Sequence, residues 1–82
     1  MAQSVDDLHQ EWLLTIGKHI RKLRKERTAM GYIEFAKQIG MDKKTYYKIE
    51  RGEGNFNITN LMRIVSFYKE MTMQEFFAEA EL

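Results

Sequence analysis

Apolar residues recur at intervals of three and four along almost the whole of this 82-residue chain, and no proline interrupts them. This spacing places apolar side chains on one face of an α-helix, and the alternation typical of β-strands is absent. The longest stripe predicts a helix over residues 5–27, with Gly17 as a point where it can break. The residues of that stripe are Val5, Leu8, Trp12, Ile16, Ile20 and Leu23.

Four shorter helices follow, and each has residues that start or stop helices at its ends. We expect these helices at residues 32–39, 43–51, 58–68 and 73–81. Expected N-cap residues are Ser4, Asp42, Asn57 and Thr72, the last paired with Glu75 in a capping box. Gly40 and Gly52 suit the left-handed position that follows a helix. The prediction is an all-α fold in one domain over residues 1–82, with an acidic helical extension at residues 1–15.

The formal net charge of +1 hides an uneven distribution. Residues 1–15 carry three acids and no Lys or Arg, and residues 70–82 carry four acids and no Lys or Arg. Between them, residues 18–27 have a net charge of +5 and residues 37–51 have +3. A basic middle between acidic ends orients a molecule in front of a polyanion such as DNA. Charge runs are also found on ordinary solvated faces, so charge alone does not establish DNA binding.

Residues 32–51 have the spacing of a helix-turn-helix. Ala36 is small where the second helix must cross closely, and Gly40 supplies a positive φ in the turn. Tyr46 and Ile49 lie three apart and face inward. The opposite face of the second helix then presents Lys43, Lys44, Tyr47 and Lys48. Cations and an aromatic hydroxyl on an exposed helix are suited to the major groove of DNA.

The chain resembles the Xre type of Cro and phage-repressor helix-turn-helix proteins over residues 16–77. The matching strings are Ile16–Arg24, Phe35–Asp42 and Tyr46–Gly52, continued by Asn55 and by Met73–Phe77. This resemblance implies a five-helix, lambda-repressor-like DNA-binding domain with an extended first helix. It also implies that the protein regulates transcription, for example as a repressor.

The resemblance implies a role for each matching residue. Base edges would be read by Lys43, Lys44, Thr45, Tyr47 and Lys48. Arg24 and Glu50 match a pair that joins the first helix to the recognition helix, so Glu50 is interpreted as structural. Phosphates would be contacted at the start of the second helix and around the loop before the fourth, by Tyr32, Arg51, Asn55 and Asn57.

The chain departs from the family pattern at three places. One extra residue lies between Arg27 and Phe35, and Tyr32 stands where the family favours Gln. The loop holds Glu53 and Phe56 where lysines and a proline are common. Tyr46 is bulkier than the usual aliphatic residue. These departures concern affinity and individual contacts, not the fold.

No constellation in the sequence indicates catalysis, a metal site or a cofactor. The chain has no cysteine, which excludes thiolate nucleophiles, thiolate zinc sites and disulfides. His9 and His19 lie ten apart without a third ligand on a shared face. We therefore predict that the protein is not an enzyme and binds neither metal nor cofactor. No apolar run is long enough for a membrane span, and the acidic N-terminus is unlike a secretory signal, so we predict a cytoplasmic protein.

The terminal helices carry more apolar residues than one face of each helix needs. These residues either complete the core or form a dimer contact, for which the candidates are Trp12, Phe76, Phe77 and Leu82. We predict a homodimer that binds double-stranded DNA in a sequence-specific manner, because repressors of the resembled family commonly pair. Two half-sites about 34 Å apart would match such a dimer.

Other functions stay open at this point. One alternative is an antitoxin-like interaction module that masks a protein partner through its apolar terminal helices. Another is general coating of DNA without sequence preference. Small members of the resembled family include phage repressors, restriction-modification controllers and antitoxins, and the sequence does not separate them. The chain ends at Leu82, so we expect no ligand-sensing domain.

Overall fold

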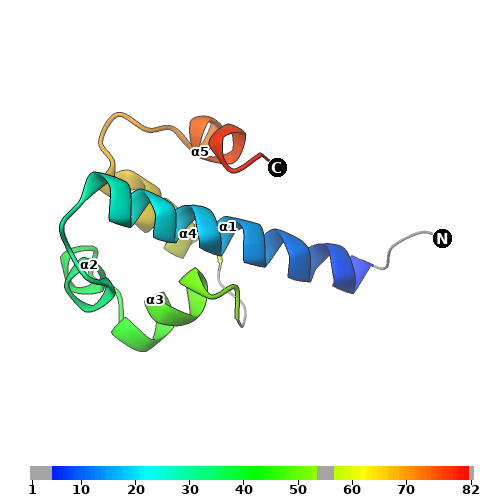
Figure 1. Cartoon of the computed structure of the whole chain (residues 1–82), viewed down its shortest axis with the longest axis horizontal. Helices are drawn as coiled ribbons and strands as arrows, with labels where there is room; N and C mark the ends of the chain where they lie inside the picture. The colour runs from blue at the N-terminus through cyan, green and yellow to red at the C-terminus, as the bar shows by residue number, and fades with distance from the viewer. Residues whose placement is uncertain (1–4, 54–56, 82) are drawn as a thin grey trace.

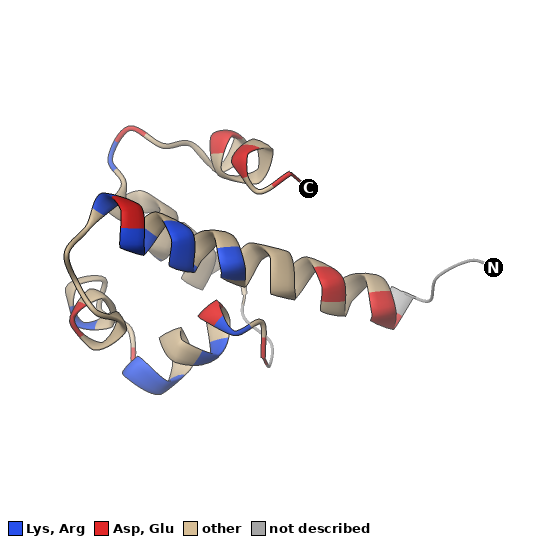
Figure 2. Ribbon diagram, viewed as in Figure 1, with Lys and Arg blue, Asp and Glu red and all other residues tan. Residues whose placement is uncertain are grey.

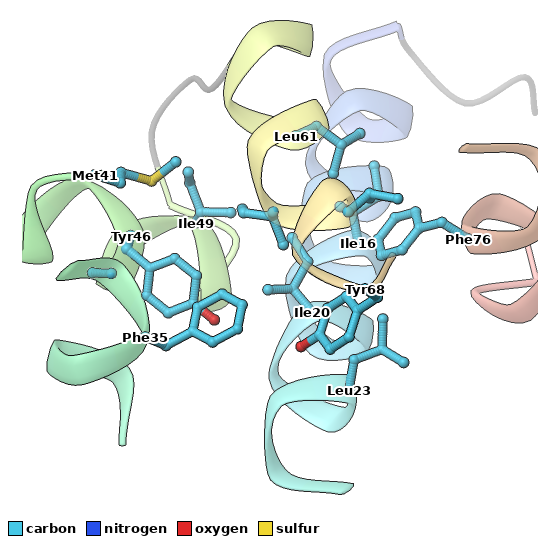
Figure 3. Packing of buried hydrophobic residues seen from close by; sticks show 13 residues of the cluster. Ile16, Ile20, Leu23, Phe35, Met41, Tyr46, Ile49, Leu61, Tyr68 and Phe76 are labelled. Atoms are coloured by element: carbon cyan, nitrogen blue, oxygen red, sulfur yellow. The ribbon is translucent and has the colours of Figure 1, made fainter. Parts of the chain in front are cut away.

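Five helices make up the fold in the computed structural model, which describes residues 5–53 and 57–81 (Figure 1). They are α1 (Val5–Arg27), α2 (Tyr32–Gln38), α3 (Lys43–Glu50), α4 (Ile58–Phe67) and α5 (Met73–Glu79). No strand occurs within these two ranges, so the predicted all-α, five-helix architecture is confirmed. The long α1 runs through the middle of the molecule, with α2 and α3 on one side and α5 on the other (Figures 1 and 3).

The predicted start signals of three helices are confirmed. The Asp42 carboxylate accepts hydrogen bonds from the backbone N–H groups of Lys44 and Thr45, at 3.0 and 3.3 Å. The Asn57 side chain accepts from the Asn60 N–H at 2.9 Å. Thr72 and Glu75 form both hydrogen bonds of a capping box. These bonds satisfy N–H groups that have no partner within the first turn of a helix. The cap expected at Ser4 lies outside the described residues.

The helix ends follow the sequence signals closely. Gly40 and Gly52 both have a φ of +69°, the left-handed conformation that glycine adopts without steric cost. α2 to α5 each end one or two residues before the predicted position. The residues just past these ends are C-caps rather than helical residues, and they are Ile39, Arg51, Tyr68 and Ala80.

The prediction that α1 can break at Gly17 is wrong, because α1 is continuous from Val5 to Arg27. A Cβ atom at this position would lie 2.5 Å from the carbonyl oxygen of Ile49 and 2.7 Å from that of Glu50. Such distances are too short for a carbon atom. Gly17 therefore allows the C-terminal end of α3 to approach the backbone of α1.

The core lies between α1, α4 and the helix-turn-helix (Figure 3). Phe35 is fully buried at its centre, with ring centroids 5.2 Å from Tyr46 and 4.8 Å from Phe67. Such ring pairs add to the free energy gained by burying apolar surface. The predicted inward faces are confirmed at Ala36, Tyr46 and Ile49 and along α4 at Leu61, Ile64, Val65 and Tyr68.

Only the C-terminal part of the apolar stripe on α1 belongs to the core. Ile16, Ile20 and Leu23 are buried, whereas Leu8 and Trp12 are exposed, Trp12 by 56%. The reason is visible in Figure 1: the first turns of α1 extend beyond the other helices. An apolar stripe is buried only where another element covers it.

Phe76 attaches α5 to the body of the protein. Its side chain is fully buried, with its ring centroid 5.0 Å from that of His19 on α1. This burial corrects the proposal of Phe76 as a dimer contact, because the residue is already used inside the chain's own core. Phe77 is partly buried against the same core. Leu82 lies outside the described residues.

The substitution Gly17→Ala tests the close approach of α1 and α3. In an open helix this change stabilises the fold by about 1 kcal/mol, because alanine favours helix more than glycine does. Here the new methyl group meets two carbonyl oxygens, and we expect a loss of roughly 1–3 kcal/mol in the free energy of unfolding, measured by urea denaturation. The exposed control Gln10→Ala should change it by less than about 0.5 kcal/mol. A stabilised Gly17→Ala protein would contradict the observed contact.

His19 makes the stability of the fold depend on pH. Burial lowers the pKa of His19, and the nearby Glu79 carboxylate, 3.9 Å from Nε2, only partly opposes this effect. A histidine with a lowered pKa in the folded state binds fewer protons there than in the unfolded chain. The free energy of unfolding should therefore fall as the pH drops through about 6.5, where the unfolded histidine gains its proton.

This pH effect is measured by urea denaturation, as the difference between the free energies of unfolding at pH 7.5 and at pH 5.5. We expect His19→Gln to reduce this difference in the free energy of unfolding, and the exposed, non-titrating control Gln10→Ala to leave it unchanged. If the free energy of unfolding depended on pH identically in the wild type and in His19→Gln, His19 would not be the cause of the pH dependence.

Candidate nucleic-acid interface

α3 has two faces with different roles. Tyr46, Ile49 and Glu50 point into the protein and are buried. The residues predicted to read bases are all exposed, and they are Lys43, Lys44, Thr45, Tyr47 and Lys48. The structure thus brings these five exposed residues together on α3, and Figure 2 shows basic positions along this helix.

Arg24 and Glu50 form the predicted pair between α1 and α3. Arg24 Nε donates to Glu50 Oε2 at 2.8 Å, and Arg24 Nη2 donates to Oε1 at 3.0 Å. The two side chains are only 9% and 6% exposed. Arg24 Nη1 also donates to the carbonyl oxygen of Met30 at 3.0 Å. One guanidinium group therefore joins α1 to α3 by a bidentate, charge-assisted pair of hydrogen bonds. A third bond joins it to the segment that leads into α2.

The Tyr46 hydroxyl is a third member of this network that the sequence reasoning missed. It donates a hydrogen bond to Glu50 Oε2. Burial, and then the hydrogen bond to the Glu50 carboxylate, raises the pKa of Tyr46 well above its usual value, so the hydroxyl stays protonated. The available signal was the spacing of Tyr46 and Glu50, because residues four apart lie on the same face of a helix.

Tyr47 is exposed by 41% but is held in place by its neighbours. Its ring centroid lies 5.1 Å from that of Tyr32 at the start of α2. Arg51 Nη1 donates to the Tyr47 hydroxyl at 3.1 Å, and the Arg51 guanidinium carbon lies 5.4 Å from the ring centroid. An aromatic side chain held in this way loses little conformational entropy when it contacts a ligand.

The residues predicted to contact phosphates have different surroundings. Tyr32 and Arg51 both lie beside Tyr47, next to the outward face of α3. Arg51 Nε also donates to Glu53 Oε1 at 3.1 Å in an exposed pair. Asn57 uses its side-chain oxygen to cap α4. Asn55 lies outside the described residues.

Two surface hollows meet at the tyrosine pair Tyr32 and Tyr47. The first, of about 310 Å³, is lined by both tyrosines and by Lys43, Lys44, Lys48 and Glu53. The second, of about 460 Å³, lies between α1 and α3 and is lined by both tyrosines and by Leu14, Lys18, Arg21, Arg24, Glu50 and Arg51. The sequence reasoning did not single out Lys18 and Arg21 as site residues.

Metal-ligand groups and membrane-spanning helices are both absent from the part of the chain that the structure describes. No three His, Asp or Glu side chains gather there in an arrangement that could hold a metal ion. Among residues 5–53 and 57–81, no helix has the length and apolar character needed to cross a membrane.

A protein family described as Helix-turn-helix matches residues 20–76, which is more than half of the chain. The match contains α2, α3 and α4 in full. The chain belongs to this family of Xre-type DNA-binding transcription regulators. Together with the five helices, this membership confirms the predicted lambda-repressor-like fold.

Similarity to one curated helix-turn-helix relative extends over most of both chains. The relative is the control protein C.MunI from a Mycoplasma species, which is 37% identical over 68 residues. The matched region covers 83% of this chain and 90% of the relative. No solved structure matches the chain.

A pair of substitutions tests the importance of the buried carboxylate. Glu50→Ala leaves the Arg24 guanidinium buried without a counter-charge, so we expect the free energy of unfolding to fall by roughly 3–5 kcal/mol. The matched control is Glu53→Ala, which removes the exposed partner of Arg51 and should cost about 0–1 kcal/mol. Urea denaturation of both variants measures the difference. Equal losses would show that the buried pair has no special part in stability.

Proposed function

We propose that this protein is a sequence-specific transcription controller that places α3 in the major groove of double-stranded DNA. The observation that carries this proposal is the division of α3 into two faces. Its inward face is fixed to α1 through Glu50 and Arg24, and its outward face presents only polar, basic and aromatic side chains. A rigidly held helix of this kind can align several side chains with successive base pairs. The name of the relative, a control protein, supports a controlling role.

Four exposed residues of α3 have suitable partners in the groove. The ammonium groups of Lys43, Lys44 and Lys48 are donors for the O6 and N7 atoms of guanine. Thr45 can contact several bases through its hydroxyl and methyl groups. Tyr32, Arg51 and Asn57 supply donors for phosphates at the margins of this surface. The proposed activity is binding, without a catalytic step.

Charge outside the interface favours one orientation on DNA. The first turns of α1 carry Asp6, Asp7 and Glu11, and α5 carries Glu75 and Glu79. Figure 2 shows these acidic positions away from α3, at the projecting end of α1 and on α5 across the molecule. Repulsion of these carboxylates from DNA and attraction of the α3 lysines both turn the same surface toward the duplex.

The proposed DNA-bound form is a homodimer. This part of the proposal is supported by large apolar side chains that the chain leaves exposed away from α3. They are Leu8 and Trp12 on α1 and Ile58 and Met62 on α4. Trp12 has the largest side chain of the group and is 56% exposed, so we place it at the contact between protomers. Burial of such aromatic side chains commonly dominates binding energy at interfaces.

Reading of bases is tested with Lys44→Ala. If Lys44 contacts a base, we expect a loss of about 1–3 kcal/mol in binding free energy and a relaxed preference at one base pair. The measurement is titration against a selected duplex, its single-base-pair variants and a random duplex. The control Lys69→Ala removes the same charge from an exposed position between α4 and α5. Equal weakening on every duplex would make Lys44 a phosphate contact, and equal affinity of the wild type for all duplexes would contradict sequence-specific binding.

Dimer formation is tested through Trp12, the only tryptophan in the sequence. We expect sedimentation to give a dimer at micromolar protein, and Trp12 fluorescence to shift to longer wavelength on dilution as the contact opens. Trp12→Glu should yield a monomer with unchanged helix content. If Met62→Glu dissociated the dimer and Trp12→Glu did not, the contact between protomers would lie on α4 and not on α1. A monomeric wild type at all concentrations, free and on DNA, would refute the dimer.

A further inference from the structure

The hollow between α1 and α3 has a second set of basic side chains, separate from those on the outward face of α3. Lys18 and Arg21 line it from α1, and Arg51 lines it from the end of α3. Lys18 and Arg21 lie three apart, so their side chains project from the same side of α1. The Leu14 side chain forms an apolar part of the wall.

The positive charge of this hollow is only partly neutralised by the protein. Arg24 and Glu50 form a complete bidentate pair and contribute no net charge. Arg51 is paired with Glu53. The side chains of Lys18 and Arg21, in contrast, make no hydrogen bond or ion pair within the described ranges. Two adjacent cations on a partly apolar wall form a site that attracts an anion.

The position of the hollow indicates which anion would lie in it. It shares Tyr32 and Tyr47 with the hollow that Lys43, Lys44 and Lys48 line. A duplex whose base edges face those lysines therefore has sugar-phosphate backbone next to the tyrosine pair. A guanidinium group can bind phosphate oxygens in a bidentate manner, and an ammonium group adds a point charge.

We propose that Lys18 and Arg21 of α1 bind a backbone phosphate of the DNA in this hollow. The proposal depends on the DNA binding proposed above, and it adds the first helix to the contact surface. DNA is then held by two elements, with α3 reading bases and α1 fixing the backbone beside it. Phosphate contacts of this kind set the register of a protein on the duplex but carry no sequence information.

The test compares two double variants that remove the same charge. Lys18→Gln with Arg21→Gln empties the hollow of its unpaired cations. Lys22→Gln with Lys69→Gln is the control, because these exposed residues line hollows on the α5 side of α1. All four side chains are exposed, so both variants should fold, which circular dichroism and thermal unfolding verify. The charge-conserving Lys18→Arg with Arg21→Lys should bind DNA like the wild type.

Affinity is measured for a selected and a random duplex between about 50 and 200 mM salt. Each phosphate contact adds about 0.9 to the slope of log K against log salt. We therefore expect the Lys18/Arg21 variant to have a slope smaller by roughly 1–2 on both duplexes, so that over this range it loses about 4- to 16-fold less affinity than the wild type. The control should keep a slope close to that of the wild type.

A neutral methylphosphonate, placed at one backbone position at a time, identifies the phosphate. At one position per half-site, it should weaken the wild type and the control but not weaken the Lys18/Arg21 variant further. If the wild type binds a selected duplex and the two double variants behave alike, the hollow does not bind phosphate and the proposed function still stands. If the wild type binds no duplex at any salt concentration, the proposed function fails and this proposal fails with it.

Discussion

The buried carboxylate of Glu50 holds α3 so that its lysines face outward. α3 has only eight residues, and a helix of that length is not stable alone in water. Its position therefore comes from contacts with other helices, among them the bidentate pair with Arg24 of α1. Within α3, the Tyr46 hydroxyl donates to the same carboxylate and helps to orient it. Because Arg24 also binds the Met30 carbonyl oxygen, the segment before α2 is held by the same group. Without this network the exposed lysines of α3 would have no fixed position relative to α1.

The same small helix serves stability and binding because its two faces use different chemistry. Inward residues are large and buried, and their polar atoms are satisfied within the protein, as the Tyr46–Glu50 bond shows. Three of the five outward residues are exposed lysines, a residue type that loses side-chain entropy when it is ordered. Tyr47 differs from these lysines, because Tyr32 and Arg51 already restrict it. The exposed face thus combines one pre-positioned aromatic ring with mobile cations.

Features that depend on neighbours in sequence were predictable. The caps at Asp42, Asn57 and Thr72 depend on residues within one helical turn, and all three are present. Features that depend on distant elements were not. Gly17 suggested a break because periodicity does not show that α3 approaches α1 there. The sequence leaves Phe76 as either a core residue or a dimer contact, because it does not show what covers α5, whereas in the structure Phe76 is buried. Lys18 and Arg21 were part of a charge run, and only the packing of α1 against α3 separates them from the other cations of that run.

Gly52 has a mechanical consequence for the projecting part of α1. A Cβ atom at Gly52 would lie 2.8 Å from the Cα atom of Leu14, so the turn after α3 rests directly on the α1 backbone. α1 is one uninterrupted helix of 23 residues. Gly17 and Gly52 let the end of α3 and the turn after it lie directly on the α1 backbone, and the acidic first turns of α1 extend beyond these contacts (Figure 1). A change in the tilt of α1 would therefore displace α3 without an intervening side chain to absorb it.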